Sequence, residues 1–304
     1  MLSSRRAFCA ACAAAAALSG VRPVAAAEKP RIVAVTYALA YFAERLAGDA
    51  AEVAFPVPAG RDPALWRPQI SDISAIQSAD LILLNGAGFA GWTTKASLPR
   101  GRLVDTSRAF ADRYIKTKSI THSHGADGEH THEGVAAFTW LDQTLAAQQA
   151  EAVAAGLNRA KIGAPEAIDA ALQRLKATLA ALDAEAGALA AAASGAAAIA
   201  THPRYQYFAR AYGLEIASLD WEAGAAPSAA QLQALSALIA ATGARVLIWE
   251  AAPPAAAREA VRALGVRDAV FPTLAAAPAS GDYETTLRNA VAELRAAFDR
   301  AKAG

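Results

Sequence analysis

The chain has 304 residues, a formal net charge of +1, 55% hydrophobic residues, five histidines and two cysteines. The near-neutral charge argues against a nucleic-acid-binding protein, which needs a basic surface. Alanine supplies much of the hydrophobic fraction, and after residue 20 no stretch of about 18 residues is both strongly apolar and uncharged, so we expect no transmembrane helix there. The length is sufficient for one large domain or two of ordinary size.

Residues 1–27 have the composition of an export signal. They contain three arginines and no acidic residue, then an Ala/Leu stretch, then three alanines at 25–27. This order predicts a signal peptide cleaved after about Ala27, and therefore a periplasmic protein. The S-R-R-A-F sequence around Arg5 and Arg6 resembles a twin-arginine signal. The general secretion route and a short buried N-terminal helix are the alternatives.

The two cysteines are not expected in the mature protein. Cys9 and Cys12 are spaced like a redox motif, but both lie in the predicted signal. A lipoprotein interpretation of Cys12 is weaker, because too little apolar sequence precedes it. The predicted mature chain has no thiol, and loss of the three signal arginines changes its net charge from +1 to −2.

The first part of the mature chain alternates short β-rich runs with helical patterns. We expect strands at 31–36, 52–57, 81–84 and 103–105, and helices at 37–47 and 72–79. This alternation is typical of a parallel sheet covered by helices.

The pattern changes at 116–134, a polar stretch that we interpret as a loop. A helix is expected at 141–157, and Pro165 stands at a favourable first position for another helix that runs to residue 193. Its apolar residues recur in steps of four and three, which is the spacing of one helical face. They are Ile168, Leu172, Leu175, Leu179, Leu182, Ala186 and Leu189. About 30 helical residues span roughly 45 Å, so we predict one long helix that connects two lobes.

The strand–helix alternation resumes after Gly195. We expect strands at 197–200, 215–219, 246–250 and 269–271, and helices at 205–212, 228–242, 255–264 and 283–301. Ser228 is the predicted N-cap of its helix. The sequence therefore predicts an α/β fold of two lobes with parallel sheets joined by one long backbone helix. The expected boundaries are an N-terminal lobe at 28–160, the linking helix at 161–195 and a C-terminal lobe at 196–304.

Gly86, Gly88 and Gly91 form a G-x-G-x-x-G sequence after a predicted strand. A dinucleotide-binding motif must open a helix long enough to cross back over the sheet. Only about eleven residues, broken by a proline and a glycine, precede the next predicted strand, so we interpret the sequence as a turn. No catalytic motif is found in its expected context, and we do not expect an enzyme.

Four of the five histidines lie close together in the predicted loop: His122, His124, His130 and His132. Neutral imidazole is a good zinc, copper and nickel ligand, and three carboxylates lie nearby. The segment 121–133 therefore predicts metal binding, with an affinity limited by the entropy of ordering a loop. A solvated linker that happens to contain histidines is the alternative.

Eight stretches spread over the mature chain carry a family resemblance. They are 34–37, 62–68, 79–88, 104–107, 140–142, 202–207, 211–214 and 281–283. Together they resemble the periplasmic zinc and manganese solute-binding proteins of ABC importers, of the ZnuA and TroA type. The resemblance implies two α/β lobes joined by a long rigid helix, and capture of a divalent ion, Zn²⁺ ahead of Mn²⁺, for an inner-membrane ABC permease. We expect a monomer.

The resemblance also implies four metal ligands, of which this chain keeps one. The positions of the first two histidines correspond to Ala64 and Phe138, and the third histidine corresponds to His202. The carboxylate position falls at Pro272 or Thr273. Since one imidazole does not make a closed tetrahedral zinc site, we expect His202 to bind metal only together with the loop histidines. A capping or packed histidine beside Pro203 at a strand end is the alternative.

These replacements make the expected cleft aromatic. Its candidate residues are Trp66, Phe138, Trp140 and Tyr205, with Glu250 as a further candidate at a strand end. Glu250 also fits an ordinary hydrogen-bonded strand-end acid, and we expect Arg67 and Arg204 to be surface charges. The alternative function is a degenerate family member that binds a non-metal solute or a partner protein in this cleft.

Overall fold

The computed structural model describes residues 28–117 and 134–303, so the expected signal peptide and the four loop histidines lie outside the described residues. The strands are β1 Arg31–Ala34, β2 Glu52–Ala54, β3 Leu81–Leu84, β4 Leu103–Asp105, β5 Lys116–Thr117, β6 Gly134–Val135, β7 Ala198–Ala200, β8 Ile216–Ser218, β9 Val246–Trp249 and β10 Arg267–Val270. The α-helices are α1 Tyr37–Ala47, α2 Ile70–Gln77, α3 Gln143–Ala160, α4 Pro165–Gly187, α5 Leu189–Ala193, α6 Gln206–Ala211, α7 Ala229–Thr242, α8 Ala255–Ala263 and α9 Tyr283–Ala303. Short 3-10 helices occupy Gly48–Ala50, Gly91–Thr94, Arg100–Arg102, Arg108–Arg113 and Thr139–Leu141.

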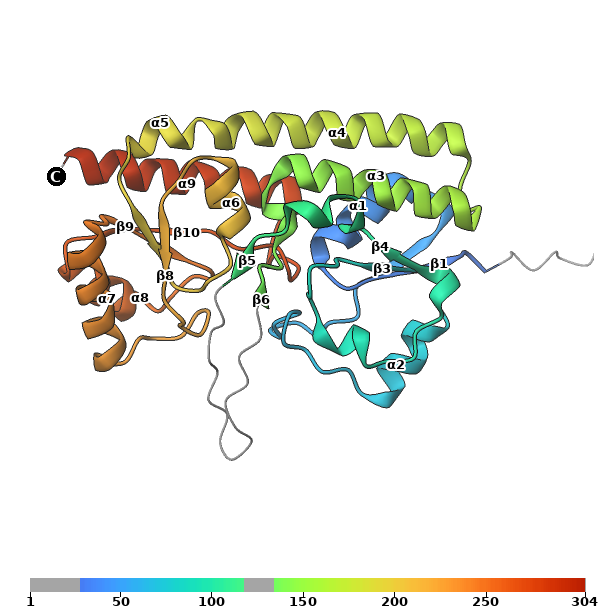
Figure 1. The fold of residues 1–304 in the computed structure, drawn as a ribbon, viewed down its shortest axis with the longest axis horizontal. Coiled ribbons are helices and arrows are strands. Elements are labelled where there is room, and N and C mark those ends of the chain that lie inside the picture. Colours follow the sequence, from blue (N-terminus) through green and yellow to red (C-terminus); the bar gives the residue numbers. More distant parts are fainter. Residues whose placement is uncertain (1–27, 118–133, 304) are drawn as a thin grey trace, which may run out of the picture.

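Two parallel sheets form the centres of two lobes, which confirms the predicted fold class (Figure 1). The N-lobe sheet has the order β2-β1-β3-β4 and the C-lobe sheet the order β10-β9-β7-β8, with every pair parallel. The central strands β1 and β9 are almost completely buried, as expected for short apolar strands covered on both faces. The carboxyl ends of the C-lobe strands form one edge, on which the candidate site is built.

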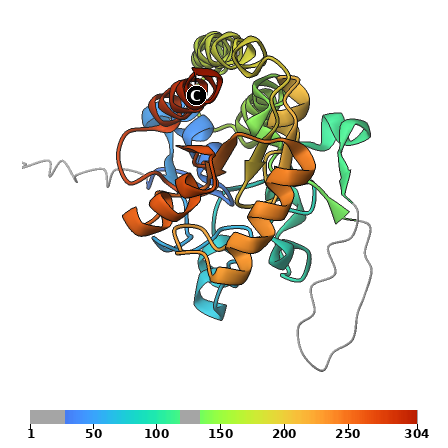
Figure 2. The ribbon, with the colours of Figure 1, turned by 90° about the vertical axis from the view of Figure 1, so that its left-hand side faces the viewer.

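The long helix predicted to link the lobes is confirmed for most of its length. α4 packs against α3 from the N-lobe and against α9 from the C-lobe. Figure 2 shows α4 and α9 side by side along one side of the molecule. The helix is interrupted at Ala188, directly after Gly187, because glycine weakens a helix by roughly 0.5–1 kcal/mol relative to alanine. α5 then continues to Ala193.

Local chemistry explains where other expected boundaries shift. β2 ends at Ala54 because prolines follow at 56 and 58 and cannot donate ladder hydrogen bonds. α3 begins after Asp142, whose carboxylate accepts hydrogen bonds from the first backbone N–H groups of the helix. β10 begins earlier than expected, at Arg267. The charged Asp268 interrupts the apolar pattern in the sequence, but its side chain is buried and ion-paired, so the strand includes it.

The glycine-rich turn after β3 is confirmed. Gly86 has a φ of +76°, and a Cβ atom there would lie 2.1 Å from the Ser107 hydroxyl oxygen and 2.2 Å from an Asp105 carboxylate oxygen. The turn leads into the short 3-10 helix Gly91–Thr94 rather than into a crossover helix. The sequence therefore lacks the geometry of a dinucleotide-binding motif.

One apolar cluster runs through both lobes. Its buried members include Leu83 and Trp140 from the N-lobe, Leu179 from α4, and Ile248 and Phe271 from the C-lobe. The two lobes therefore share a core rather than meeting only across a polar surface. No helix in the described part of the chain is long and apolar enough to cross a membrane.

Candidate functional site at the junction of the lobes

The carboxyl ends of the C-lobe strands place three polar side chains together. His202 follows β7, Glu250 follows β9 and Thr273 follows β10. Thr201 fixes the first two in register, since its hydroxyl accepts a hydrogen bond from the backbone N–H of Glu250 at 3.3 Å. The Thr273 hydroxyl donates to Glu250 Oε1 at 3.1 Å. This edge of a parallel sheet is where α/β proteins bind ligands.

Arg204 is the centre of the site. Its Nη1 donates to Glu250 Oε1 at 2.6 Å, and its Nη2 contacts the carboxylate of Asp62 from the N-lobe. The guanidinium also lies over the ring of Phe138, with 5.0 Å from Cζ to the ring centroid. Burial alone would lower the pKa of Arg204, but the charges of Glu250 and Asp62 raise it above its usual value. The expectation that Arg204 is a surface charge is wrong, because only 7% of the residue is exposed.

His202 lies between two carboxylates. Its Nδ1 is 3.1 Å from Glu250 Oε2, and its Nε2 is 3.4 Å from Asp220 Oδ1. The His202 side chain is 19% exposed and that of Asp220 is 59% exposed, so one ring nitrogen points inward and the other toward solvent. Glu250 is therefore both a strand-end hydrogen-bonding acid and a part of the candidate site.

The structure brings most of the expected ligand positions together, but not as metal ligands. Phe138 contacts the Arg204 guanidinium, Thr273 bonds Glu250, and Ala64 lies two residues after Asp62, which accepts from the Ala64 backbone N–H at 3.0 Å. Within residues 28–117 and 134–303, no three His, Cys, Asp or Glu side chains are placed to hold one metal ion. A buried guanidinium stands among the carboxylates instead.

The aromatic candidates do not lie together on one exposed surface. Phe138, Trp140 and Tyr205 are 6%, 0% and 2% exposed. The rings of Phe138 and Trp140 lie 5.1 Å apart, and the Tyr205 hydroxyl donates to a backbone carbonyl at 2.6 Å. Burial, and then the Glu250 charge, raise the pKa of Tyr205 well above its usual range. Trp66 packs elsewhere, against Trp92 at 5.8 Å between ring centroids.

The described residues on either side of the segment 118–133 lie next to each other. β5 and β6 form an antiparallel pair in which Thr117 lies opposite Gly134. Beside it, the backbone N–H of Ile115 donates to the hydroxyl of Tyr207 at 3.3 Å. Tyr207 belongs to α6, which begins four residues after His202. The strands β5 and β6 that flank the segment are thus held next to the element that follows His202.

Sequence reasoning missed Asp62 and Asp220. Asp220 comes two residues after β8, so the edge that suggested Glu250 could also have suggested it. Asp62 lies in a loop of the other lobe, 142 positions from Arg204, and no local pattern indicates that pairing. Arg67 is exposed, as expected.

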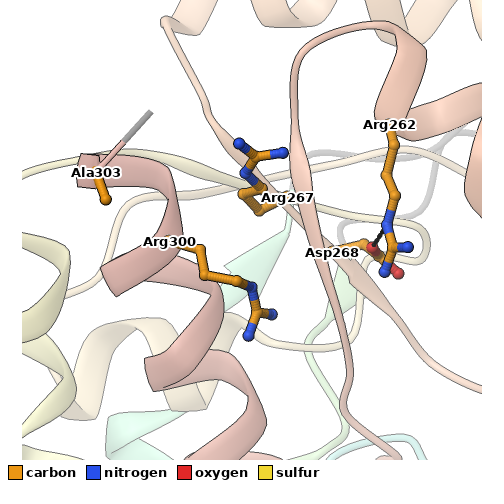
Figure 3. A pocket seen from close by; sticks show the side chains of 5 residues that line it. All are labelled: Arg262, Arg267, Asp268, Arg300 and Ala303. Atoms are coloured by element: carbon orange, nitrogen blue, oxygen red, sulfur yellow. Dashed lines mark hydrogen bonds and ion pairs between the residues drawn. The ribbon is translucent and has the colours of Figure 1, made fainter.

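A separate cavity of about 490 Å³ lies at the amino end of β10, away from the carboxyl ends of the strands that carry the His202 site (Figure 3). Arg262, Arg267 and Arg300 line it together with Asp268 and Ala303. Arg267 and Asp268 begin β10, whereas Thr273 follows its other end. Asp268 is ion-paired with Arg262 at 2.7 Å, so part of the positive charge is already neutralised. The cavity is not continuous in the fold with the His202 site.

Comparisons with known proteins agree with the fold. The model of the ZnuA family, described as the periplasmic component A of a zinc-uptake complex, matches residues 32–297. The zinc-binding lipoprotein AdcA of Streptococcus pneumoniae serotype 4 is 26% identical over 215 residues, covering 68% of this chain and 42% of AdcA. The chain therefore spans less than half the length of this curated relative.

Solved structures show the same arrangement. The metal-dependent lipoprotein YcdH of Bacillus subtilis superposes with a TM-score of 0.73 at 20% identity, covering 89% of this chain and all of YcdH. The solute-binding protein FpvC of Pseudomonas aeruginosa, in complex with Mn²⁺, gives a TM-score of 0.72 at 21% identity, covering 90% of this chain and all of FpvC. At these identities the likeness concerns the fold alone.

Proposed function

This chain belongs to the ZnuA family of periplasmic zinc-uptake components, and from that premise we propose that it captures a divalent metal ion, Zn²⁺ ahead of Mn²⁺, and delivers it to an inner-membrane ABC permease. The observation that carries the proposal is that the chain matches this family over residues 32–297 and has its two-lobe fold. At the junction of the lobes, Glu250 from one lobe and Asp62 from the other bind the guanidinium of Arg204, while His202 lies between Glu250 and Asp220. The protein itself supplies the cation at this carboxylate pair, so the proposal assigns metal capture to other residues.

The histidines of the segment 118–133 are the proposed capture ligands. His122, His124, His130 and His132 supply the nitrogen donors in this proposal. It is supported by the finding that the described residues contain no group of three His, Cys, Asp or Glu side chains placed to hold one metal ion. Neutral imidazole binds zinc, and protonation removes its free lone pair, so acid releases the ion. The anchoring of β5–β6 beside α6 supports a role for His202 as a fifth nitrogen ligand.

Zinc titration of the exported protein tests the proposal. We expect one or more ions bound with a dissociation constant of about 1 μM or tighter. Replacing the four segment histidines by alanine is expected to abolish this binding, whereas the control Thr121→Ala/Ser123→Ala/Thr131→Ala leaves it unchanged. Equal zinc affinity in the histidine variant and in the control would contradict the proposal.

We also propose export through the signal at 1–27, with cleavage after about Ala27. The twin-arginine route predicts that Arg5→Lys/Arg6→Lys leaves the precursor in the cytoplasm. Unchanged export of this variant would assign the chain to the general secretion route instead. Mass spectrometry of the exported protein gives the cleavage position.

Binding of a non-metal solute or a partner protein is the second candidate. The observation that favours it is the positive charge of Arg204 at the junction, which opposes a second cation there. Native mass spectrometry of protein purified from its own periplasm separates the candidates. A stoichiometric metal supports the first, and an organic adduct or a copurified protein supports the second.

A further inference from the structure

The junction between the lobes is built around a single guanidinium. Arg204 is 7% exposed and binds a carboxylate from each lobe, Glu250 with Nη1 and Asp62 with Nη2. Its third face lies over Phe138, at 5.0 Å from Cζ to the ring centroid. Both terminal nitrogens of the guanidinium therefore have a carboxylate partner and one of its faces lies over an aromatic ring, as expected for a buried and compensated charge.

The groups around Arg204 are those that bind divalent ions. Glu250 and Asp62 are bound to it directly, and Glu250 also faces His202, whose other nitrogen faces Asp220. Three carboxylates and one imidazole are suitable oxygen and nitrogen donors for a divalent metal. The guanidinium occupies Glu250 Oε1 and one carboxylate oxygen of Asp62, and it repels a second cation at short range.

We propose that Arg204 is the resident cation of this junction and excludes divalent metal from it. A metal ion can use Glu250 Oε1 and Asp62 only when the guanidinium has left. The inference rests on the proposed function in one respect, that the cargo is a divalent cation. It deepens that function in two ways. The resting protein captures metal with ligands other than Glu250 and Asp62, and Arg204 determines whether metal can bind at the junction.

The experiment starts from the exported protein with His122, His124, His130 and His132 replaced by alanine, so that the junction is the site under test. Zinc affinity is measured by competition with a chelator, and ligand type by the absorption of bound Co²⁺. Adding Arg204→Gln is expected to create one site with at least tenfold higher zinc affinity than the parent variant. Adding His202→Ala to the glutamine variant is expected to reverse most of that gain.

Two further variants control for charge and for folding. Arg204→Lys keeps a cation beside the carboxylates and is expected to bind zinc no better than the parent variant. Arg204→Met keeps an apolar stem against Phe138 and serves if the glutamine variant does not fold. For every variant the midpoint of thermal unfolding is measured with and without zinc, because an ion that binds only the native state raises it.

The outcomes are decisive. A zinc-dependent rise in the unfolding midpoint of the glutamine or methionine variant, absent from the parent and the lysine variant, supports the proposal. Tight one-to-one zinc binding by the parent variant overturns it, as does failure of both neutral variants to gain affinity or thermal protection. The unmutated protein is titrated in parallel: if it binds no zinc, the proposed function fails, whatever Arg204 does.

Discussion

The Glu250 carboxylate binds Arg204, Thr273 and His202, so we expect its neutralisation to destabilise the protein. Its Oε1 accepts from Arg204 at 2.6 Å and from Thr273 at 3.1 Å, and its Oε2 faces His202 at 3.1 Å. Only 9% of the residue is exposed. Glu250→Gln keeps the shape and one acceptor oxygen but removes the charge that Arg204 faces.

The magnitude follows from what remains beside Arg204. Removing one partner of a buried ion pair costs about 3–5 kcal/mol, because the other charge stays buried without compensation. Here Asp62 still pairs with the guanidinium, and its side chain is 26% exposed, so the compensation is partial. We therefore expect a loss of about 2–3 kcal/mol in the free energy of unfolding. This corresponds to a decrease of about 4–12 °C in the midpoint of thermal unfolding.

The assay is thermal and urea unfolding of the exported protein in the presence of a chelator, so that bound metal does not alter the comparison. Glu222→Gln is the matched control, since Glu222 is exposed in the same lobe. We expect the control to lie within about 0.5 kcal/mol of the unmutated protein. Equal stability of the two glutamine variants would refute the conclusion that the Glu250–Arg204 pair compensates a buried charge.

Three further changes test other parts of the fold. Gly86→Ala is expected to lower the free energy of unfolding by more than about 1 kcal/mol, because φ is +76° and the new Cβ would lie 2.1 Å from a side-chain oxygen. Gly91→Ala is the control, since no atom lies within 4 Å of a Cβ there. Equal stability of the two variants would contradict this reasoning. Burial raises the pKa of Tyr283, so its phenol ionises more easily in the unfolded chain than in the fold. Its contribution to stability is therefore complete below about pH 10 and is lost as the pH rises further. Tyr283→Phe removes the hydroxyl hydrogen bonds to Trp140 and Gln143 and is expected to be less stable by about 1 kcal/mol at pH 7. This difference in stability from the unmutated protein should narrow above pH 10, and a difference that stays constant would argue against the reasoning. Hydrogen bonds from Thr285, first from its backbone N–H and then from its side chain, and after them Arg45, hold the pKa of Asp282 below its usual value. Asp282→Asn is therefore expected to lose about 0.5 kcal/mol at pH 7, a difference that disappears as the pH falls from about 4 to 2. Persistence of the difference at pH 2 would show another cause.

The fold was predictable because its signals are local. The alternation of strands and helices and the stripe from Ile168 to Leu189 depend on residues a few positions apart, and the structure confirms both. The junction was only partly predictable. Glu250 could be placed because it ends a predicted strand, and His202 because the family resemblance implies a histidine there. The burial of Arg204 depends on Asp62, 142 positions away in the other lobe.

The shared core also limits how cargo can reach the junction. Trp140 from the N-lobe donates from Nε1 to the backbone carbonyl of Thr273 in the C-lobe at 2.7 Å, and Tyr283 donates to the Trp140 carbonyl at 3.1 Å. Wide opening of the lobes would break these buried hydrogen bonds and separate an apolar cluster common to both. We therefore expect exchange through movement of side chains, of which Arg204 is the central one.

The absence of cysteine from the sequence after residue 27 makes this expectation measurable. Spin labels are attached at Ile70→Cys in the N-lobe and Glu259→Cys in the C-lobe, both exposed positions. Their distance distribution is recorded with chelator and with saturating zinc, and we expect the mean to change by less than about 2 Å. Since α4 packs along both α3 and α9, a hinge between the lobes would also have to bend or slide this helix. A larger change would show that the shared core opens, and that the guanidinium of Arg204 is not the main barrier to the junction.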